Sequence, residues 1–305
     1  MKNKIIMITG ATGVIGTHFL WRLTGMGCTI YALHNRDLTK YHMSLTFPDV
    51  IFMQGNLTDS TFSDTLPMAD IIIHAATYSS PSLFTANPIE TIQLNTSTTI
   101  ELLNKLKDKG KFLFISSSEV YSGLKNDFFS ETQIGTTTTE HPRACYIESK
   151  RCGEAICINS GKDVKIARLG YVYGDGTRSG DGRVLYDFVD QALVCGGITG
   201  RGTGSNKRAY CYATDAIQMM WNILNSGKQV IYNIGGTEVI TIRELSMEIA
   251  KLVGAFSISV GYDEDDGSPS SSALDMYRYN SEFGKYQYTT LKKGLEKVIK
   301  WQRHY

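Results

Sequence analysis

Residues 4–16, KIIMITGATGVIG, decide the fold of this 305-residue chain. The first six of them are largely apolar and β-branched, which predicts a short buried strand. Glycines follow at positions 10, 13 and 16, and the residues after them carry apolar side chains at helical spacing. A glycine-rich turn between a buried strand and a helix is typical of the nucleotide-binding turn of doubly wound α/β folds.

Strands and helices alternate through the residues that follow. Strands are expected at residues 28–33, 50–54, 70–75, 111–116 and 164–169, and helices at residues 17–25, 88–109 and 143–160. This alternation predicts an α/β fold with a doubly wound parallel Rossmann sheet. After Tyr173 the pattern changes, with frequent glycine and serine, helices expected at residues 184–193, 214–224 and 241–253, and a loop at 263–272.

Two domains follow from this change of pattern. We expect a Rossmann domain over residues 1–173, with return segments near 209–235, and a smaller lobe that occupies mainly residues 174–305. The length of the chain agrees with one large or two modest domains.

Composition excludes several classes of protein. The chain has 31 Lys and Arg against 30 Asp and Glu, so it lacks the basic field that nucleic-acid binding needs. No apolar run reaches the length of a membrane span, and polar residues interrupt the apolar start before a signal peptide could form. The six cysteines contain no CxxC pair, which favours reduced thiols over a metal site. We expect a cytoplasmic protein.

The glycine turn is expected to bind the pyrophosphate of a dinucleotide. One glycine makes the tight turn, one lets the backbone approach the phosphates, and one lets helix and strand pack closely. The phosphates then lie at the helix N-terminus, where N–H groups and the helix dipole favour an anion. The residues expected to hold the dinucleotide here are Gly10, Thr12, Gly13, Val14, Ile15 and Gly16.

The end of the second strand bears on the choice of cofactor. NAD sites usually have an acidic residue there to hold the ribose 2′-hydroxyl, but this chain reads ALHNRD at residues 32–37. Asn35 and Arg36 suit a 2′-phosphate, so NADP is the predicted cofactor. NAD is the alternative, if Asp37 turns back toward the ribose or Arg36 is only a solvated charge.

A candidate catalytic group lies in the helix expected at residues 143–160. Tyr146 and Lys150 are four residues apart, which places both side chains on one helix face. A lysine ammonium stabilises a phenolate, so the tyrosine could exchange a proton with a sugar oxygen while a hydride moves to or from nicotinamide. Ser118 and Glu119 follow the fifth strand, where ligands of open α/β sheets bind. Glu119 is either a second acid/base group or an ordinary loop carboxylate.

Together these motifs resemble the extended short-chain dehydrogenase/reductase family, and in particular its nucleotide-sugar epimerase/dehydratase/decarboxylase branch. The resemblance extends over nearly the whole chain. The segments that carry it are GATGVIG, the HAA at residues 74–76, Asn95, SSSEVY, PRACYIESKRCGE, the segment from Asp181 to Leu193, KRAYCY at 207–212 followed by Asp215 (similar to an RxFxYVxD pattern), YNIGG at 232–236, TIRELS and LKKGLEKVIKW.

The resemblance implies a set of site residues. Ser118, Glu119, Tyr146 and Lys150 would be catalytic, and Tyr146 and Lys150 would also contact the cofactor. The further cofactor contacts that it implies are Asn56, Leu57, Ala75 and Ala76, and the implied substrate contacts are Tyr78, Ser118, Arg183 and Arg208. It also implies a homodimer built on the helices at 88–109 and 143–160.

Three reactions of that branch compare differently with these residues. Glu119 and Arg208 match positions used by UDP-glucuronate decarboxylases. The 4,6-dehydratases have Asp where this chain has Ser118, and the 4-epimerases lack a glutamate at the position of Glu119. Two features depart from the decarboxylases: the second strand ends without an acid, and Ser272 takes the place of an arginine, for which Arg278 is the candidate substitute.

The cofactor argument favours a reductase. A decarboxylase returns its hydride and keeps NAD bound, whereas a ketoreductase consumes a reduced cofactor, usually NADPH. We therefore predict C4 reduction of a dTDP-linked 4-keto-6-deoxyhexose in cell-surface polysaccharide biosynthesis. UDP-glucuronate decarboxylation is the first alternative. A non-catalytic NADP-sensing protein is the second, although such a protein is expected to lose the Tyr146–Lys150 pair.

Overall fold

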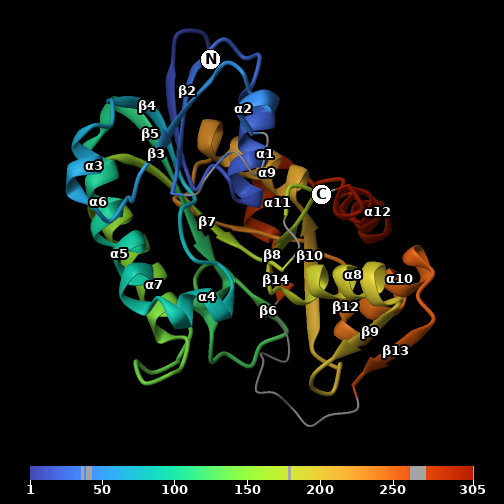
Figure 1. Ribbon diagram of the computed structural model, residues 1–305. Coiled ribbons are helices and arrows are strands. Elements are labelled where there is room, and N and C mark those ends of the chain that lie inside the picture. Colours follow the sequence, from blue (N-terminus) through green and yellow to red (C-terminus); the bar gives the residue numbers. More distant parts are fainter. Residues whose placement is uncertain (36–37, 39–42, 178–179, 262–272, 305) are drawn as a thin grey trace. The chain divides into compact units, whose positions relative to one another are not determined.

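A computed structural model describes residues 1–35, 38, 43–177, 180–261 and 273–304 (Figure 1). The chain forms two compact units, each built from several segments. Unit 1 comprises Met1–Val120, Gly135–Arg168 and Ile217–Tyr232, and unit 2 comprises Tyr121–Ile134, Leu169–Ala216 and Asn233–Tyr305. Arg36, Ser272 and the loop expected at residues 263–272 lie outside the described residues.

A seven-stranded sheet, formed by the described residues, is the centre of unit 1 and confirms the predicted α/β fold. Its order is β11-β7-β5-β4-β1-β2-β3, and the pairings β3–β2, β2–β1, β1–β4 and β4–β5 are parallel. The strands are β1 (Ile5–Thr9), β2 (Thr29–His34), β3 (Val50–Gln54), β4 (Ala69–His74), β5 (Leu106–Ser117), β7 (Asp163–Leu169) and β11 (Ile231–Ile234), the last reaching the start of a unit 2 segment.

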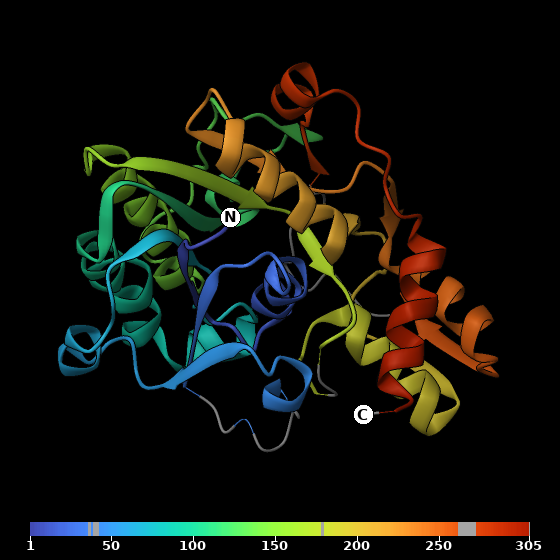
Figure 2. The same ribbon diagram turned by 90° about the horizontal axis from the view of Figure 1, so that it is seen from above.

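The direction of the strand order reverses between β1 and β4. From β1 the chain proceeds to β2 and β3 on one side, and then returns to β4 and β5 on the other. Ligands of such sheets bind beyond the carboxyl ends of the strands at this reversal. Helix α1 (Val14–Leu23) covers one face of the sheet, whereas α5 (Pro88–Asn95), α6 (Ser97–Asn104) and α7 (Ala144–Asn159) cover the other (Figures 1 and 2).

The single helix expected at residues 88–109 is wrong in two respects. It is interrupted at Thr96, whose φ and ψ are −119° and −84°, and it ends at Asn104 because β5 begins at Leu106. Side-chain hydroxyls compete here with backbone N–H groups for the helix carbonyls. Thr96 Oγ1 donates to the Ile92 carbonyl at 2.7 Å, and Ser97 Oγ donates to the Gln93 carbonyl at 3.2 Å.

Shorter helices complete the connections of unit 1. They are α2 (Met43–Thr46), α3 (Ser60–Asp64), α4 (Pro81–Ala86), the 3₁₀ turn at Ser118–Tyr121, which runs one residue into unit 2, and most of α9 (Ala213–Ser226). Arg22 of α1 lies 5.4 Å from the ring of Trp221 on α9, which ties the later chain segment to this unit. Among the described residues, no helix combines the length and apolar character needed to cross a bilayer.

Unit 2 has smaller sheets and a core of its own. Strands β12 (Val239–Thr241), β10 (Lys207–Tyr212) and β8 (Tyr171–Tyr173) form one sheet, while β13 (Ser257–Val260) pairs with β9 (Gly197–Gly200), and β14 (Ala273–Leu274) pairs with β6 (Phe128–Phe129). Its helices are α8 (Val184–Cys195), α10 (Ile242–Val253), α11 (Tyr277–Phe283) and α12 (Leu291–Gln302). Buried tyrosine, leucine and isoleucine side chains from α8, α10, α12 and the strands form the core.

Candidate active site

The glycine turn after β1 is shaped by close backbone contacts. Gly10 has a φ of +64°, and a Cβ there would lie 2.9 Å from the Cα of Ala76, just beyond β4. A Cβ on Gly16 would lie 2.4 Å from the carbonyl oxygen of Gly10. Glycine is therefore required at both positions, because the side chain of any other residue would push α1 or the end of β4 away from the turn.

A buried hydrogen-bond network joins the ends of β1 and β4. The Thr9 hydroxyl lies 2.8 Å from His74 Nδ1 and accepts the N–H groups of Ala75 and Ala76 at 3.1 and 3.0 Å. His74 Nε2 lies 2.9 Å from the Leu94 carbonyl, so this nitrogen carries the proton of the neutral ring. Burial lowers the pKa of His74 to about 3, so the network keeps its neutral histidine at physiological pH.

The start of α1 provides a place for phosphates. Gly13 is the N-cap, its conformation is extended, and no side chain caps the helix. Helix N-terminal N–H groups bind anions well. A Cβ on Gly13 would lie 3.3 Å from the Gly10 carbonyl, so the glycine turn offers a cradle that larger residues would narrow. The turn also hydrogen-bonds β2, since Ala11 N–H donates to the Leu33 carbonyl at 3.1 Å. These residues fit a dinucleotide.

The other residues expected to contact the cofactor follow neighbouring strands. Asn35 is exposed just after β2, and Arg36 lies outside the described residues. Asn56 follows β3, and its side-chain oxygen accepts hydrogen bonds from the backbone N–H and the hydroxyl of Thr58, both at 3.0 Å. The Leu57 carbonyl accepts a hydrogen bond from Thr98 at 3.0 Å, which fixes this segment against α6.

Tyr146 and Lys150 share one buried face of α7. The Lys150 ammonium nitrogen lies 5.8 Å from the centre of the Tyr146 ring and donates to the Ile115 carbonyl at 2.7 Å. It also lies 5.0 Å from the Phe114 ring centre. Tyr146 is 7% and Lys150 2% exposed, so a proton exchanged at this pair is shielded from bulk water.

A buried ion pair lies one helical turn beyond Lys150. Glu154 accepts two hydrogen bonds from Arg168 Nε, at 2.9 and 3.2 Å, one from its Nη2 at 2.7 Å, and a further one from the Ser116 hydroxyl. Burial lowers the pKa of Lys150 to about 7, and the charge of Glu154 opposes that shift. The ion pair therefore helps to retain the lysine charge in a buried position.

Glu119 is held by an arginine at the start of α7. Arg143 Nη2 lies 2.8 Å from Glu119 Oε1, and the side chains are 25% and 12% exposed. The guanidinium carbon of Arg143 lies 5.5 Å from the Phe84 ring centre, and Phe84 stacks on Tyr146 with ring centres 4.8 Å apart and planes 11° apart. We call Phe84, Arg143 and Glu119 the brace, because it connects the Glu119 carboxylate to the Tyr146 ring.

Serines at the end of β5 lie next to Glu119. Ser118 is partly exposed and begins the 3₁₀ turn. Ser117 is the last residue of β5, and its hydroxyl accepts the Glu119 N–H at 3.2 Å. Ser117 is therefore a second candidate for a hydroxyl that contacts substrate. Tyr78, expected to contact substrate, donates to Glu90 at 2.8 Å on α5.

Both arginines expected to bind substrate lie in unit 2. Arg183 is the N-cap of α8, forms an ion pair with Asp181 through two nitrogens, and lies 4.9 Å from the Tyr186 ring centre. Arg208 on β10 is 6% exposed, donates to the Lys207 carbonyl at 2.8 Å and lies 5.0 Å from the Tyr171 ring centre. Two guanidinium groups against tyrosine rings form a setting suited to phosphate oxygens.

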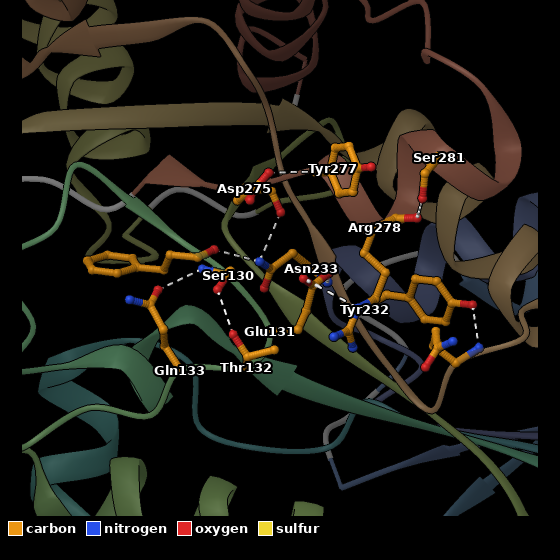
Figure 3. A network of polar contacts seen from close by, with 12 residues as sticks. Ser130, Glu131, Thr132, Gln133, Tyr232, Asn233, Asp275, Tyr277, Arg278 and Ser281 are labelled. Carbon is orange, nitrogen blue, oxygen red and sulfur yellow. Dashed lines mark hydrogen bonds and ion pairs between the residues drawn. The ribbon is translucent and has the colours of Figure 1, made fainter.

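Arg278 belongs to a structural network of unit 2 (Figure 3). Its Nε lies 3.6 Å from Oε2 of the buried Glu131, and the other oxygen of Glu131 accepts the Asn233 N–H at 2.9 Å. The Asn233 side-chain amide donates to the carbonyls of Phe129 and Asp275, at 2.7 and 3.0 Å. Arg278 thus connects α11 to a network that holds β6, β11 and the residue after β14 together.

Several residues of the site were missed by the sequence analysis. Phe84 and Arg143 contact the candidate catalytic side chains, the charge of Glu154 acts on Lys150, and Thr9 fixes the end of β4. Helical spacing offered one usable signal, because Glu154 lies four residues after Lys150 and eight after Tyr146. The stacking of Phe84 on Tyr146 left no such signal, since these residues are far apart in the sequence.

Residues 6–235 match the model of the NAD dependent epimerase/dehydratase family. The chain belongs to this family. The protein is an enzyme of the NAD dependent epimerase/dehydratase family.

Two curated relatives differ in the activity that their names give. UDP-glucuronic acid decarboxylase 1 of Danio rerio is 29% identical over 98% of this chain and 72% of its own length. The dTDP-4-dehydro-6-deoxy-D-allose reductase of Streptomyces bikiniensis is 28% identical over 99% of this chain and 97% of its own length. Both therefore match nearly the whole chain at similar identity, although they carry different activities in their names.

Solved structures of similar fold confirm the architecture. A UDP-glucose 4-epimerase from Thermotoga maritima with UDP-glucose has a TM-score of 0.84 at 21% identity and covers 98% of this chain and 99% of its own. The dTDP-glucose 4,6-dehydratase DesIV of Streptomyces venezuelae, with NAD bound, has a TM-score of 0.84 at 23% identity and covers 98% and 97%. At these identities the likeness concerns the fold alone.

Proposed function

We propose that this protein is an NADPH-dependent reductase that acts at C4 of a dTDP-linked 4-keto-6-deoxyhexose, in cell-surface polysaccharide biosynthesis. The observation that carries the proposal is the arrangement of acid/base groups. Tyr146 lies beside the buried Lys150, whereas the Glu119 carboxylate is engaged by Arg143. Reduction of a ketone needs one proton donor, and Tyr146 can supply that proton without help from Glu119.

The residues of the chain have separate roles in this reaction. A reduced nicotinamide cofactor held at the glycine turn would provide the hydride for C4. Tyr146 donates its phenolic proton to the C4 oxygen, and the ammonium of Lys150 stabilises the phenolate that remains. Ser118 or Ser117 orients the same oxygen by a hydrogen bond. The brace and the buried position of Tyr146 keep its ring fixed and limit access of water.

NADP is the proposed cofactor, and NAD is its alternative. Members of the family bind NAD in solved structures. The proposal of NADP rests on the sequence at the end of β2, where Asn35 and Arg36 take the place of the usual acid. An arginine there can pair with a 2′-phosphate, whereas an acid would repel it.

One comparison supports a reductase, and two arginines of unit 2 support a nucleotide-sugar substrate. The Streptomyces reductase and this chain match over almost the full length of both. The guanidinium groups of Arg183 and Arg208 are suited to the two phosphates of a nucleotide sugar.

We also propose a homodimer in the cytoplasm, built on α5, α6 and α7, because Ile89, Ile100 and Ile158 on these helices are exposed.

UDP-glucuronate decarboxylation is the second candidate. It is favoured by Glu119 and Arg208 together and by the match to the Danio rerio decarboxylase. It is disfavoured by Arg278, the candidate for the missing arginine, because Arg278 pairs with the buried Glu131.

Turnover of defined substrates tests the proposal. The protein is supplied with a dTDP-linked 4-keto-6-deoxyglucose and NADPH or NADH, and separately with UDP-glucuronate and NAD. A reductase consumes one NADPH per product, since the hydride ends in the sugar, and Tyr146→Phe lowers this rate by about 10²–10⁴. Release of CO2 from UDP-glucuronate, abolished by Glu119→Gln, would replace the proposal with the second candidate.

A further inference from the structure

A tyrosine-rich face of the sheet β12-β10-β8 surrounds Arg208. Arg208, Tyr210 and Tyr212 alternate along β10, so their side chains lie on the same face. The parallel partner β8 places Tyr171 opposite Tyr210 and Tyr173 opposite Tyr212. The Tyr210 ring centre lies 5.8 Å from those of both Tyr171 and Tyr173. Arg208 therefore lies among aromatic rings that exclude water.

The hydroxyl of Tyr210 differs from those of the buried tyrosines around it. Tyr173 donates to the Leu291 carbonyl at 3.3 Å, Tyr186 accepts the Gly174 N–H at 3.0 Å, and Tyr212 donates to Asp175. The hydroxyl of Tyr210 is buried as well, but among the described residues it has no hydrogen-bond partner. Native proteins rarely leave a buried hydroxyl in this state, so it needs a specific reason.

Charge near this hydroxyl indicates what its partner is. Arg208 and Arg183 are both close enough to favour negative charge at Tyr210, although burial dominates and raises its pKa well above the ordinary value. Tyr210 therefore remains a neutral phenol with a proton to donate. Its neighbouring guanidinium groups only donate, so neither can accept that proton. The partner that suits all three groups is an anion with several acceptor oxygens.

We propose that the Tyr210 hydroxyl donates a hydrogen bond to the diphosphate of the bound nucleotide, together with Arg208 and Arg183. This rests on the proposed function, which supplies a nucleotide-diphosphate sugar as substrate. The RxFxYVxD pattern, to which residues 208–215 are similar, has phenylalanine at the position of Tyr210. The hydroxyl is thus a binding group added to that pattern.

Removal of the hydroxyl should have opposite effects on stability and on binding. In Tyr210→Phe the ring packing is kept and an unsatisfied buried group is lost, so the Tm of the ligand-free protein should rise by about 2–4 °C. The dissociation constants of UDP, dTDP and inorganic pyrophosphate should increase about tenfold, because a hydrogen bond to a charged acceptor is lost. Calorimetry on the full chain measures binding, and thermal unfolding measures Tm.

Tyr186→Phe is the matched control. It also removes a buried hydroxyl, from a ring beside Arg183, but that hydroxyl already bonds to Gly174, so the Tm should fall. If Tyr210→Phe binds the nucleotides and pyrophosphate as tightly as the unaltered protein, the inference is overturned and the proposed function stands. If the unaltered protein binds neither UDP nor dTDP, the proposed function is lost and the inference with it.

Discussion

At the scale of single residues, Arg143 connects two candidate catalytic groups, the Glu119 carboxylate and, through Phe84, the Tyr146 ring. Arg143→Ala removes the ion-pair partner of Glu119 Oε1 and the cation beside the Phe84 ring on which Tyr146 stacks. Because small displacements of reacting groups cost much rate, kcat should fall by about 10- to 100-fold while the KM of the cofactor changes little. Steady-state kinetics measure both constants.

Two variants separate this positioning role from general stability. Arg143→Lys retains the charge without the planar guanidinium and should recover part of the rate. Arg22→Ala also removes a cation from an aromatic ring, that of Trp221, and should leave kcat unchanged. An equal loss of kcat in Arg22→Ala and Arg143→Ala would show that the effect is only one of packing.

Lys150 predicts how stability depends on pH. Burial lowers its pKa to about 7 in the folded protein, from 10.5 in the unfolded chain. Between these values the unfolded chain binds the proton that the folded protein has lost, so the contribution of Lys150 to the free energy of unfolding rises with pH. The rise is at most about 1.4 kcal/mol per pH unit.

Urea unfolding of the cofactor-free protein at about pH 7 and about pH 9 measures this rise. Lys150→Met should reduce the increase between the two pH values. If the variant and the unaltered protein gain the same stability, Lys150 is not the group that titrates in this range.

The candidate site could be predicted from the sequence only where it depends on local spacing. Tyr146 and Lys150 could be placed on one face because four residues make about one helical turn. The ion pair of Glu119 with Arg143 and the stacking of Phe84 on Tyr146 depend on how separate segments fold together. No short-range pattern encodes such contacts, so the sequence left Glu119 undecided between a catalytic group and a loop carboxylate.

At the scale of elements, the contact of α1 with the glycine turn can be tested at Gly16. A Cβ there would lie 2.4 Å from the Gly10 carbonyl oxygen and 2.5 Å from the Ala11 Cα. Gly16→Ala should therefore displace α1, lower the Tm and weaken dinucleotide binding by at least about tenfold, although alanine is normally the better helix former. Thermal unfolding and fluorescence titration with NADPH and NADH measure these effects.

Gly161→Ala is a control for Gly16→Ala. Gly161 has a φ of +69° but nothing within 4 Å of its added Cβ, so this change should cost about 1–2 kcal/mol through backbone strain without loss of cofactor affinity. Unchanged NADPH affinity in Gly16→Ala would contradict the role assigned to the glycine turn.

The strands of unit 1 were predictable because most of them are buried apolar runs bounded by turns. The helix at 88–109 was not, since its apolar periodicity continues past Thr96 while hydroxyl groups interrupt the backbone. Its expected last residues instead begin β5, and Lys109 within that strand has a φ of +58°. Apolar periodicity records which side chains are buried, and it does not record where backbone hydrogen bonds change partner.

At the scale of the whole molecule, the proposed dimer makes a prediction about surface residues. Ile100 on α6 and Ile158 on α7 are 49% and 51% exposed. A charge at either position should oppose burial in an interface, so Ile100→Asp and Ile158→Asp should each give a monomer in light scattering. Val194→Asp, on α8 of unit 2, should leave the mass unchanged. A monomeric unaltered protein would remove the proposal.

The route of the chain through unit 1 decides whether this unit can be produced alone or exchanged between relatives. This unit is completed by residues 217–232, which the chain reaches only after two of the three segments of unit 2. A protein shortened after Arg168 would lack all of α9, would leave β7 as an open edge because β11 is missing, and would deprive Lys111 of the carbonyls of Leu224 and Asn225. Open edges invite aggregation. Unit 1 is therefore encoded by separate segments of the gene. Its exchange between relatives requires several simultaneous crossovers.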